Sequence, residues 1–285
     1  MNTIVSDALA HITTFLHTKE QAHMMMLHRS THLELRKRIT WQSVRFSATS
    51  NGPTYGRILK LEASGNLQSF PTATKTGKVL SVKYLVLRNN HSCNSNNIIL
   101  WPPGIHTLEV YDCPAFNQIA PEATHTFLVV HCHSFNQTVP QGIHTFQVFR
   151  CRAFNQTAPQ GTHTFEVSYC PVFNQTAPQG THRFIVYDCP VFNQTALHGI
   201  HTFIVSHCHA FNQTAPQGIH TFYVHHCITF NQTAPQGVHT FKVSECDAFN
   251  QTAPQGTHTF NVYLCPSFNQ TPLQGMNELC ICARQ

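Results

Sequence analysis

The chain repeats itself every 19 residues, and this period constrains its fold more than any other feature. A Phe followed by Asn-Gln recurs nine times from Phe116 to Phe268, and His106, Val110 and Cys113 each begin a row with the same spacing. The fixed positions give the unit Gly-x-His-Thr-Phe-x-Val-x-x-Cys-x-x-Phe-Asn-Gln-Thr-Ala-Pro-Gln. Self-similarity at a short fixed period is typical of an array whose units pack only on their neighbours.

A single unit contains one strand and no long helix. In the copy around Phe165 and Val167, apolar and variable residues alternate, and this period of two predicts a strand with one buried face over Thr164–Tyr169. Pro178 and Gly180 follow, and they favour turns and an extended return path. The four apolar side chains of one unit (two Phe, one Val and one Cys) cannot offset the entropy lost on ordering its backbone, so the units must stack. We therefore expect a β-rich solenoid with a parallel sheet, strands ~4.8 Å apart, and interior ladders of Phe, Val and Cys.

The unit resembles two known repeat families. Its spacing is similar to a short leucine-rich repeat, with Thr162, Phe165, Val167 and Cys170 in the first four slots and Phe173 one residue late. The Phe-Asn-Gln signature with a later Pro resembles the FNIP repeat family over residues 97–275, although Thr-Ala follows where Pro-Ile or Pro-Leu is usual. The resemblance implies a leucine-rich-repeat-like, right-handed stack.

The ends of the array differ from its middle. Residues 101–285 are assigned to the FNIP-like solenoid, with nine copies and a final half repeat in which Leu279 and Ile281 replace Phe and Val. Residues 46–100 are assigned to a linker and degenerate N-terminal capping repeats, because 57–63 and 83–87 have the pattern of imperfect strands. Caps are needed where a core ladder would otherwise face water. At the C-terminal end we expect a frayed or partner-covered sheet edge.

Residues 1–45 form a separate helical module in this interpretation. Leu9, Ile12, Phe15 and Leu16 lie on one helical face, and two capping-box patterns predict two further short helices. The segment resembles an F-box, although Val5 stands where Pro is usual. That resemblance implies a Skp-type adaptor protein as partner and an interface made by Ile4, Leu9, Ile12, Phe15, Leu16 and Leu27.

Charge and hydropathy exclude several classes of protein. Only 10% of residues are charged and 41% are hydrophobic, which is inconsistent with a disordered polar chain. The short basic run at residues 36–38 lies on a helical pattern without interleaved aromatics, so we expect no nucleic acid as partner. The N-terminus lacks a signal-peptide pattern and no apolar stretch is long enough for a membrane span. We therefore expect no membrane association and a cytoplasmic protein, in the host cytoplasm if it is viral, with a nuclear location as the alternative.

The repeated His and Cys rows are the main candidates for chemistry. The His row is compatible with a metal ladder, but a straight row does not converge on one ion, and we expect each His to hydrogen-bond a neighbouring turn. The Cys row is compatible with disulfides, but we expect buried reduced thiols in a reducing compartment. No nucleophile, metalloprotease or phosphate-binding motif is present. We expect no catalytic residue, no metal, no cofactor and no enzyme activity.

The variable slots of the strand are the candidate target-binding surface. Their mixture of aromatic, His and charged side chains is typical of protein interfaces, with neutral drift on a tolerant surface as the alternative. We expect these residues on a concave sheet face: Tyr111, Phe149, Arg150, Tyr169, Tyr187, His207, Tyr223, His226, Lys242 and Tyr263. The predicted function is a substrate receptor of a Skp, cullin and F-box ubiquitin ligase that recruits an unknown protein target. The alternatives are a repeat scaffold or decoy without a ligase link, and a structural solenoid that self-assembles end to end.

Overall fold

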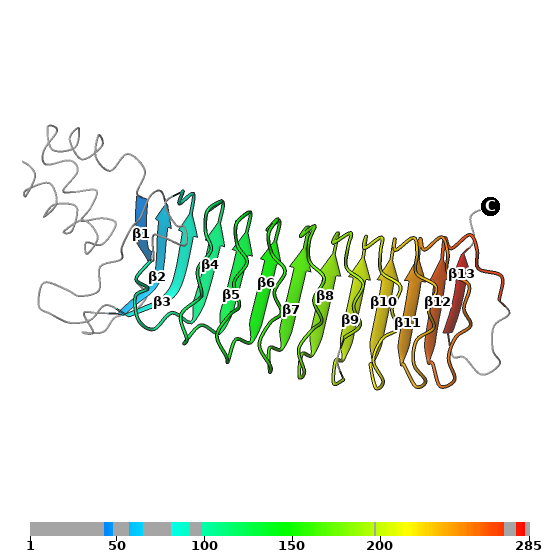
Figure 1. The fold of residues 1–285 in the computed structure, drawn as a ribbon. Helices are drawn as coiled ribbons and strands as arrows, with labels where there is room; N and C mark the ends of the chain where they lie inside the picture. Colours follow the sequence, from blue (N-terminus) through cyan, green and yellow to red (C-terminus); the bar gives the residue numbers. More distant parts are fainter. Residues whose placement is uncertain are drawn as a thin grey trace, which may run out of the picture.

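A computed structural model describes residues 43–47, 57–64, 81–91, 99–196, 198–270 and 278–282. These residues form one sheet of thirteen strands that follow one another in chain order (Figure 1). There is no helix in these ranges, and accordingly none that is long and apolar enough to cross a membrane. The predicted β-solenoid is confirmed. The F-box-like module and its six partner-interface residues lie outside the described residues.

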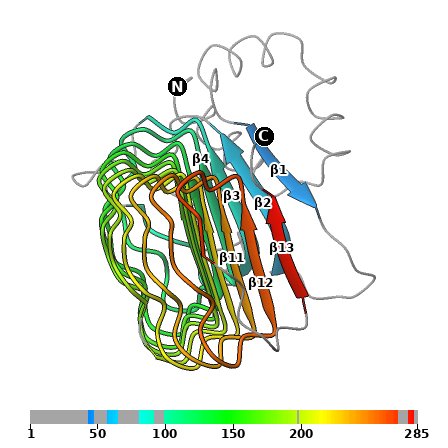
Figure 2. The same cartoon turned by 90° about the vertical axis from the view of Figure 1, so that its right-hand side faces the viewer.

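Each turn of the solenoid contributes one short strand, and the strands are these: β1 Ser43–Ser47, β2 Arg57–Ser64, β3 Ser81–Arg88, β4 Thr107–Tyr111, β5 Thr126–Val130, β6 Thr145–Phe149, β7 Thr164–Ser168, β8 Arg183–Tyr187, β9 Thr202–Ser206, β10 Thr221–His225, β11 Thr240–Ser244, β12 Thr259–Tyr263 and β13 Glu278–Cys282. Viewed along the stack, the strands lie on one side and the return loops form the other (Figure 2). Strand β7 ends at Ser168, so the expected strand was one residue too long.

The register places equivalent residues of successive turns side by side. In the parallel pairing of β7 with β8, Phe165 lies opposite Phe184 and Val167 opposite Val186, and the same register holds from β4 to β12. A shift of the strand pairing by one residue would turn all the apolar side chains of a strand toward solvent, so their burial determines the register. The expected side-chain ladders therefore follow from the pairing.

The core consists of the four predicted ladders. Phe165, Val167, Cys170 and Phe173 are all fully buried. Successive strand Phe rings are stacked, as in the pair Phe165–Phe184 with 5.4 Å between ring centroids, and each also meets a loop Phe edge-on, at 5.9 Å for Phe165–Phe173. Both geometries are favourable for aromatic pairs, so the two Phe rows make a continuous apolar spine.

The return loops are held by a ladder of asparagines. The Oδ1 atom of Asn155 accepts a hydrogen bond of 2.9 Å from the backbone N–H of Asn174, and Asn174 does the same for Asn193. A buried or half-buried loop N–H needs a partner, and the Asn of the repeat supplies one from the preceding turn. The fixed Asn of the Phe-Asn-Gln signature thus has a structural role.

The two ends of the sheet carry different strands. At the N-terminal end β1 pairs antiparallel with β2, and it begins at Ser43, so it crosses the module boundary expected at residue 45. Strands β2 and β3 confirm the degenerate strands expected in the capping region. At the C-terminal end β13 pairs with β12 so that Leu279 lies opposite Phe260 and Ile281 opposite Val262, which confirms the predicted half repeat.

Candidate functional site

The ten residues expected on one surface occupy three slots of the turn: the middle of the strand, its last residue and the residue that follows it. Tyr223 and Lys242 lie in the middle of their strands. Tyr111, Phe149, Tyr187 and Tyr263 are the last residues of theirs. The other four lie one residue beyond the strand, in left-handed backbone conformation: Arg150, Tyr169, His207 and His226. All ten therefore lie on the outward side of the sheet, and eight of them gather where the strands end.

We call the left-handed residues that follow strands β4 to β12 the post-strand row: Asp112, His131, Arg150, Tyr169, Asp188, His207, His226, Glu245 and Leu264. The backbone N–H of each residue up to Glu245 donates to the last strand carbonyl of the next turn, as Tyr169 does to Tyr187 O at 2.8 Å. This bond fixes the left-handed conformation and links neighbouring turns.

The post-strand row carries large side chains where the backbone favours glycine. The φ angle is 55° at Tyr169 and 54° at Arg150, and a left-handed L-residue costs roughly 1–2 kcal/mol. At the other left-handed position of the turn the chain uses Gly, as in Gly161 with φ 80° and Gly180 with φ 84°. The chain thus has Gly at one such position and non-Gly residues, several of them large, at the other, and persistent local strain of this kind clusters at functional sites.

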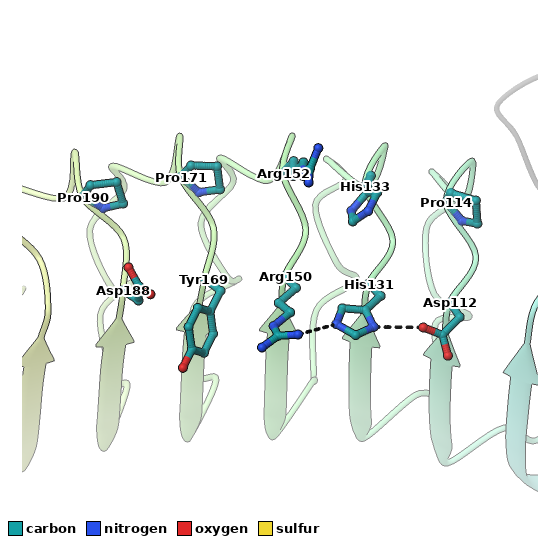
Figure 3. Close-up of a pocket in the computed structure, with 10 residues that line it drawn as sticks. All are labelled: Asp112, Pro114, His131, His133, Arg150, Arg152, Tyr169, Pro171, Asp188 and Pro190. Carbon is teal, nitrogen blue, oxygen red and sulfur yellow. Dashed lines mark hydrogen bonds and ion pairs between the residues drawn. The ribbon is translucent and has the colours of Figure 1, made fainter.

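One half of the row forms a chain of polar and aromatic interactions. The carboxylate of Asp112 lies 2.9 Å from Nδ1 of His131, and Nε2 of His131 lies 3.3 Å from the guanidinium of Arg150 (Figure 3). The Arg150 guanidinium also lies over the rings of Tyr169, at 5.1 Å, and Phe149, at 5.3 Å. The carboxylate of Asp112 is thus separated from Arg150 by an imidazole. Sequence reasoning did not select His131.

A groove runs beside these residues across five turns. It has a volume of about 750 Å³ and is bounded by the first five members of the post-strand row and by a second row two residues further along each turn (Figure 3). This second row consists of Pro114, His133, Arg152, Pro171 and Pro190. Sequence reasoning missed this row, because its position depends on the turn that follows the buried Cys. Its only sequence signal is that it varies from copy to copy.

Aromatic rings continue the surface toward the middle of the solenoid. Ring centroids are 5.0 Å apart for Phe149 and Tyr169, 5.1 Å for Tyr169 and Tyr187, and 5.0 Å for Tyr187 and His207. These rings are only partly buried. Large, rigid and partly exposed aromatic groups are the side chains that most often anchor protein interfaces.

The next turns carry a cluster of imidazoles with one carboxylate. The rings of His207 and His226 are 4.7 Å apart, and the carboxylate of Glu245 lies 3.4 Å from Nε2 of His225 and 3.5 Å from Nδ1 of His226. Desolvation and the two neighbouring imidazoles lower the pKa of His207, while the hydrogen bond from His225 lowers the pKa of Glu245. The Ser206 hydroxyl lies 2.9–3.0 Å from Nδ1 of His207 and of His225 and is only 6% exposed, so it orients the rings.

The remaining expected residues have simpler surroundings. Tyr111 donates to Glu109 at 3.0 Å and lies under the guanidinium of Arg88, at 4.0 Å. Tyr223 shares a hydrogen bond of 3.2 Å with Ser244, Lys242 is exposed, and Tyr263 is 47% exposed. These side chains extend the surface along the sheet but do not reach the groove.

The repeated His residues form a ladder at the opposite, N-terminal edge of the strands. Successive rings from His106 to His258 are stacked with centroids 4.4–4.7 Å apart. The ring Nδ1 of His163 lies 3.3 Å from Oγ1 of Thr164, the next residue, whereas the backbone N–H of His182 donates to His163 O of the preceding turn at 2.9 Å. The expected bond to a neighbouring turn is therefore made by the backbone of the His residues and not by their rings. The described residues hold no group of three ligands able to bind a metal ion.

The cysteine row is part of the core. The nine cysteines of the row from Cys113 to Cys265 are free and buried, and the thiol of Cys170 donates to a carbonyl at the end of its own strand, Ser168 O, at 3.4 Å. Burial raises the pKa of the Cys170 thiol to about 12. These groups fill space as small apolar side chains, as expected.

Comparison with known proteins returns no relative: no family model matches the sequence, and neither a curated protein nor a solved structure is similar to it. The fold and the surface define a class, a parallel β-solenoid repeat protein with an aromatic and charged edge.

Proposed function

We propose that this chain is a non-catalytic adaptor that binds a protein target along the edge where its strands end. The observation that carries the proposal is the post-strand row, in which residues such as Arg150 and Tyr169 hold large side chains in a left-handed backbone conformation. The rigid spine beneath keeps these side chains in place before a target arrives, which lowers the entropic cost of binding.

The link to a ubiquitin ligase rests on the resemblance of residues 1–45 to an F-box and of the repeats to the FNIP family. In this proposal Leu9, Ile12, Phe15 and Leu16 contact a Skp-type adaptor, together with Ile4 and Leu27. The solenoid then holds the target near the ligase. Its contribution is effective concentration, so the chain needs no catalytic residue or cofactor of its own. Such a ligase works in the cytoplasm or nucleus.

Two capture experiments test the two ends of the proposal separately. Tagged protein expressed in cells is expected to co-purify with a Skp-type adaptor, and Phe15→Ala with Leu16→Ala is expected to abolish that interaction. Tyr169→Ala with Tyr187→Ala is expected to lose target proteins while keeping the adaptor, with Gln217→Ala on an exposed return loop as the matched control. A parent protein that never captures the adaptor refutes the ligase link, and target capture that survives the two Tyr substitutions refutes the surface.

Two other functions have support of their own. If residues 1–45 do not engage a ligase, the solenoid acts as a scaffold or decoy, which the missing Pro at Val5 favours. End-to-end assembly is favoured by β13, which pairs only with β12 in the described sheet, since an open strand edge is a template for another chain. Analytical ultracentrifugation separates these functions, because only self-assembly makes the sedimentation coefficient rise with protein concentration.

A further inference from the structure

The groove beside the post-strand row selects its occupant by its repeat spacing. It crosses the turns of Asp112 and Asp188 and the three between them. Neighbouring turns are one strand spacing apart, ~4.8 Å, so a ligand that lies along the groove meets equivalent side chains every ~4.8 or ~9.6 Å.

Only one regular peptide conformation has a repeat distance close to one of these two spacings. A polyproline II helix repeats every three residues, ~9.3 Å, so it departs from the groove by about 0.6 Å over four intervals. An α-helix, with a pitch of ~5.4 Å, drifts by about 2.4 Å over the same length. A β-strand repeats every ~6.7 Å and matches neither spacing. The five turns then accommodate roughly six residues of polyproline II.

The walls of the groove suit such a segment chemically. Tyr169 contributes a partly buried aromatic ring from the post-strand row, and Pro171 and Pro190 contribute exposed apolar rings from the second row. Ligand prolines pack well on aromatic and proline surfaces. A polyproline II backbone makes no internal hydrogen bonds, so its carbonyls remain free to accept from the Arg and His donors of the groove.

The charges of the groove set the sequence of the ligand. Arg150 and Arg152 lie in its central turn, while Asp112 and Asp188 lie at its two ends. Arg152 is exposed and forms no ion pair with any residue in the described ranges. The guanidinium of Arg150 contacts the imidazole of His131 and the rings of Phe149 and Tyr169, none of which carries a negative charge. The positive charge at the centre is therefore available to a ligand.

We propose that this groove binds a proline-rich segment in polyproline II conformation with an acidic residue at its centre. The inference rests on the proposed function, since it names the class of target segment that the adaptor takes. The acidic side chain pairs with Arg152, the prolines on one side of it pack on Tyr169, Pro171 and Pro190, and those on the other side lie along the turns of His131 and Asp112.

Fluorescence anisotropy with the full chain and labelled peptides tests the proposal. Pro-Pro-Pro-Glu-Pro-Pro-Pro is expected to bind about tenfold or more tightly than Pro-Pro-Pro-Lys-Pro-Pro-Pro and than Gly-Ser-Gly-Glu-Gly-Ser-Gly. Arg152→Glu is expected to reverse the order of the two proline peptides. Arg183→Glu changes another exposed Arg, which lies at the start of β8 away from the groove, and is expected to leave binding unchanged. Both variants alter exposed side chains, and circular dichroism checks that they fold.

Three results overturn the inference: equal binding of the Gly-Ser peptide, which means charge alone decides; no effect of Arg152→Glu; or no binding of any peptide. The proposed function is judged separately. If cellular targets are still captured and are lost on Tyr169→Ala with Tyr187→Ala, the edge binds a target of another kind.

Discussion

Removal of one ring from the Phe spine tests whether the solenoid is held together by packing between turns. Phe173 is fully buried, stacks on Phe154 and Phe192 at 5.8 Å, and meets Phe165 edge-on at 5.9 Å. A Phe→Ala change in a core costs about 3–5 kcal/mol, and an aromatic pair contributes about 0.5–1.5 kcal/mol beyond area burial. Because the substitution takes away the packing partner of all three neighbouring rings, we expect the cost of Phe173→Ala to be about 5 kcal/mol, at the upper end of that range.

The same substitution near the end of the array is expected to cost about half as much. Phe268 is only partly buried and packs in the described structure on Phe249, at 5.9 Å, and Phe260, at 6.2 Å. In a one-dimensional array a central defect also uncouples the turns on either side, whereas a terminal defect only frays the end. Phe173→Ala should therefore broaden the unfolding transition, and Phe268→Ala should not.

Urea denaturation followed by circular dichroism measures both effects. Val172→Ala is the matched control, because Val172 precedes Phe173 but is 46% exposed, and its change is expected to stay within about 0.5 kcal/mol. Equal losses of stability at Phe173 and Phe268, or a loss at Phe173 no larger than that of the control, would refute a continuous spine as the source of stability.

Three further predictions concern the His ladder, the post-strand row and the thiols. Desolvation and the neighbouring imidazoles lower the pKa of His144, His201 and His239, so below about pH 6.5 the unfolded chain binds more protons than the folded chain. The unfolding midpoint in urea should therefore fall as the pH drops from about 6.5 toward these lowered pKa values. A midpoint that stays constant between about pH 7 and 5 contradicts this prediction. Tyr169→Gly should stay within about 1 kcal/mol of the parent in the same assay, because relief of left-handed strain offsets the missing packing of the ring, yet it should lose target capture. A thiol reagent should leave Cys170 unmodified in native protein and label it after denaturation, as mass spectrometry of the digested chain can show; rapid native labelling contradicts its burial.

The interior of the solenoid could be predicted from the sequence because it follows a local pattern. Alternation in Phe165-x-Val167 defines the buried face of the strand, and the fixed spacing defines the ladder, so no long-range information is needed. The same logic placed Leu279 and Ile281 in the final strand, where the structure has them.

The surface was predicted less well because its geometry depends on interactions between turns. Nothing in the sequence around Tyr169 signals a left-handed residue, since the usual Gly or Asn is absent, and the bond from its N–H to Tyr187 O decides the conformation. The groove was missed for a related reason: Arg152 and Pro171 reach it only because the turn after the buried Cys brings them above the post-strand row. Strand β1 was missed because it pairs antiparallel with β2, outside the repeat rule.

Comparison between repeats bears on whether the variable edge reflects function or neutral drift. Recent duplication makes all positions alike at first, and drift then changes exposed positions without regard to their place on the surface. Gln160, Gln179 and Gln217 are equivalent, exposed and identical, and only Glu122 and His198 differ at this position among the nine copies of the unit. In the two groove rows the equivalent residues instead differ in charge and size from turn to turn, as Arg152 and Pro171 do. Change concentrated on the outward strand positions and the two groove rows, beside a return-loop position that is Gln in most turns, favours selection for a target over drift.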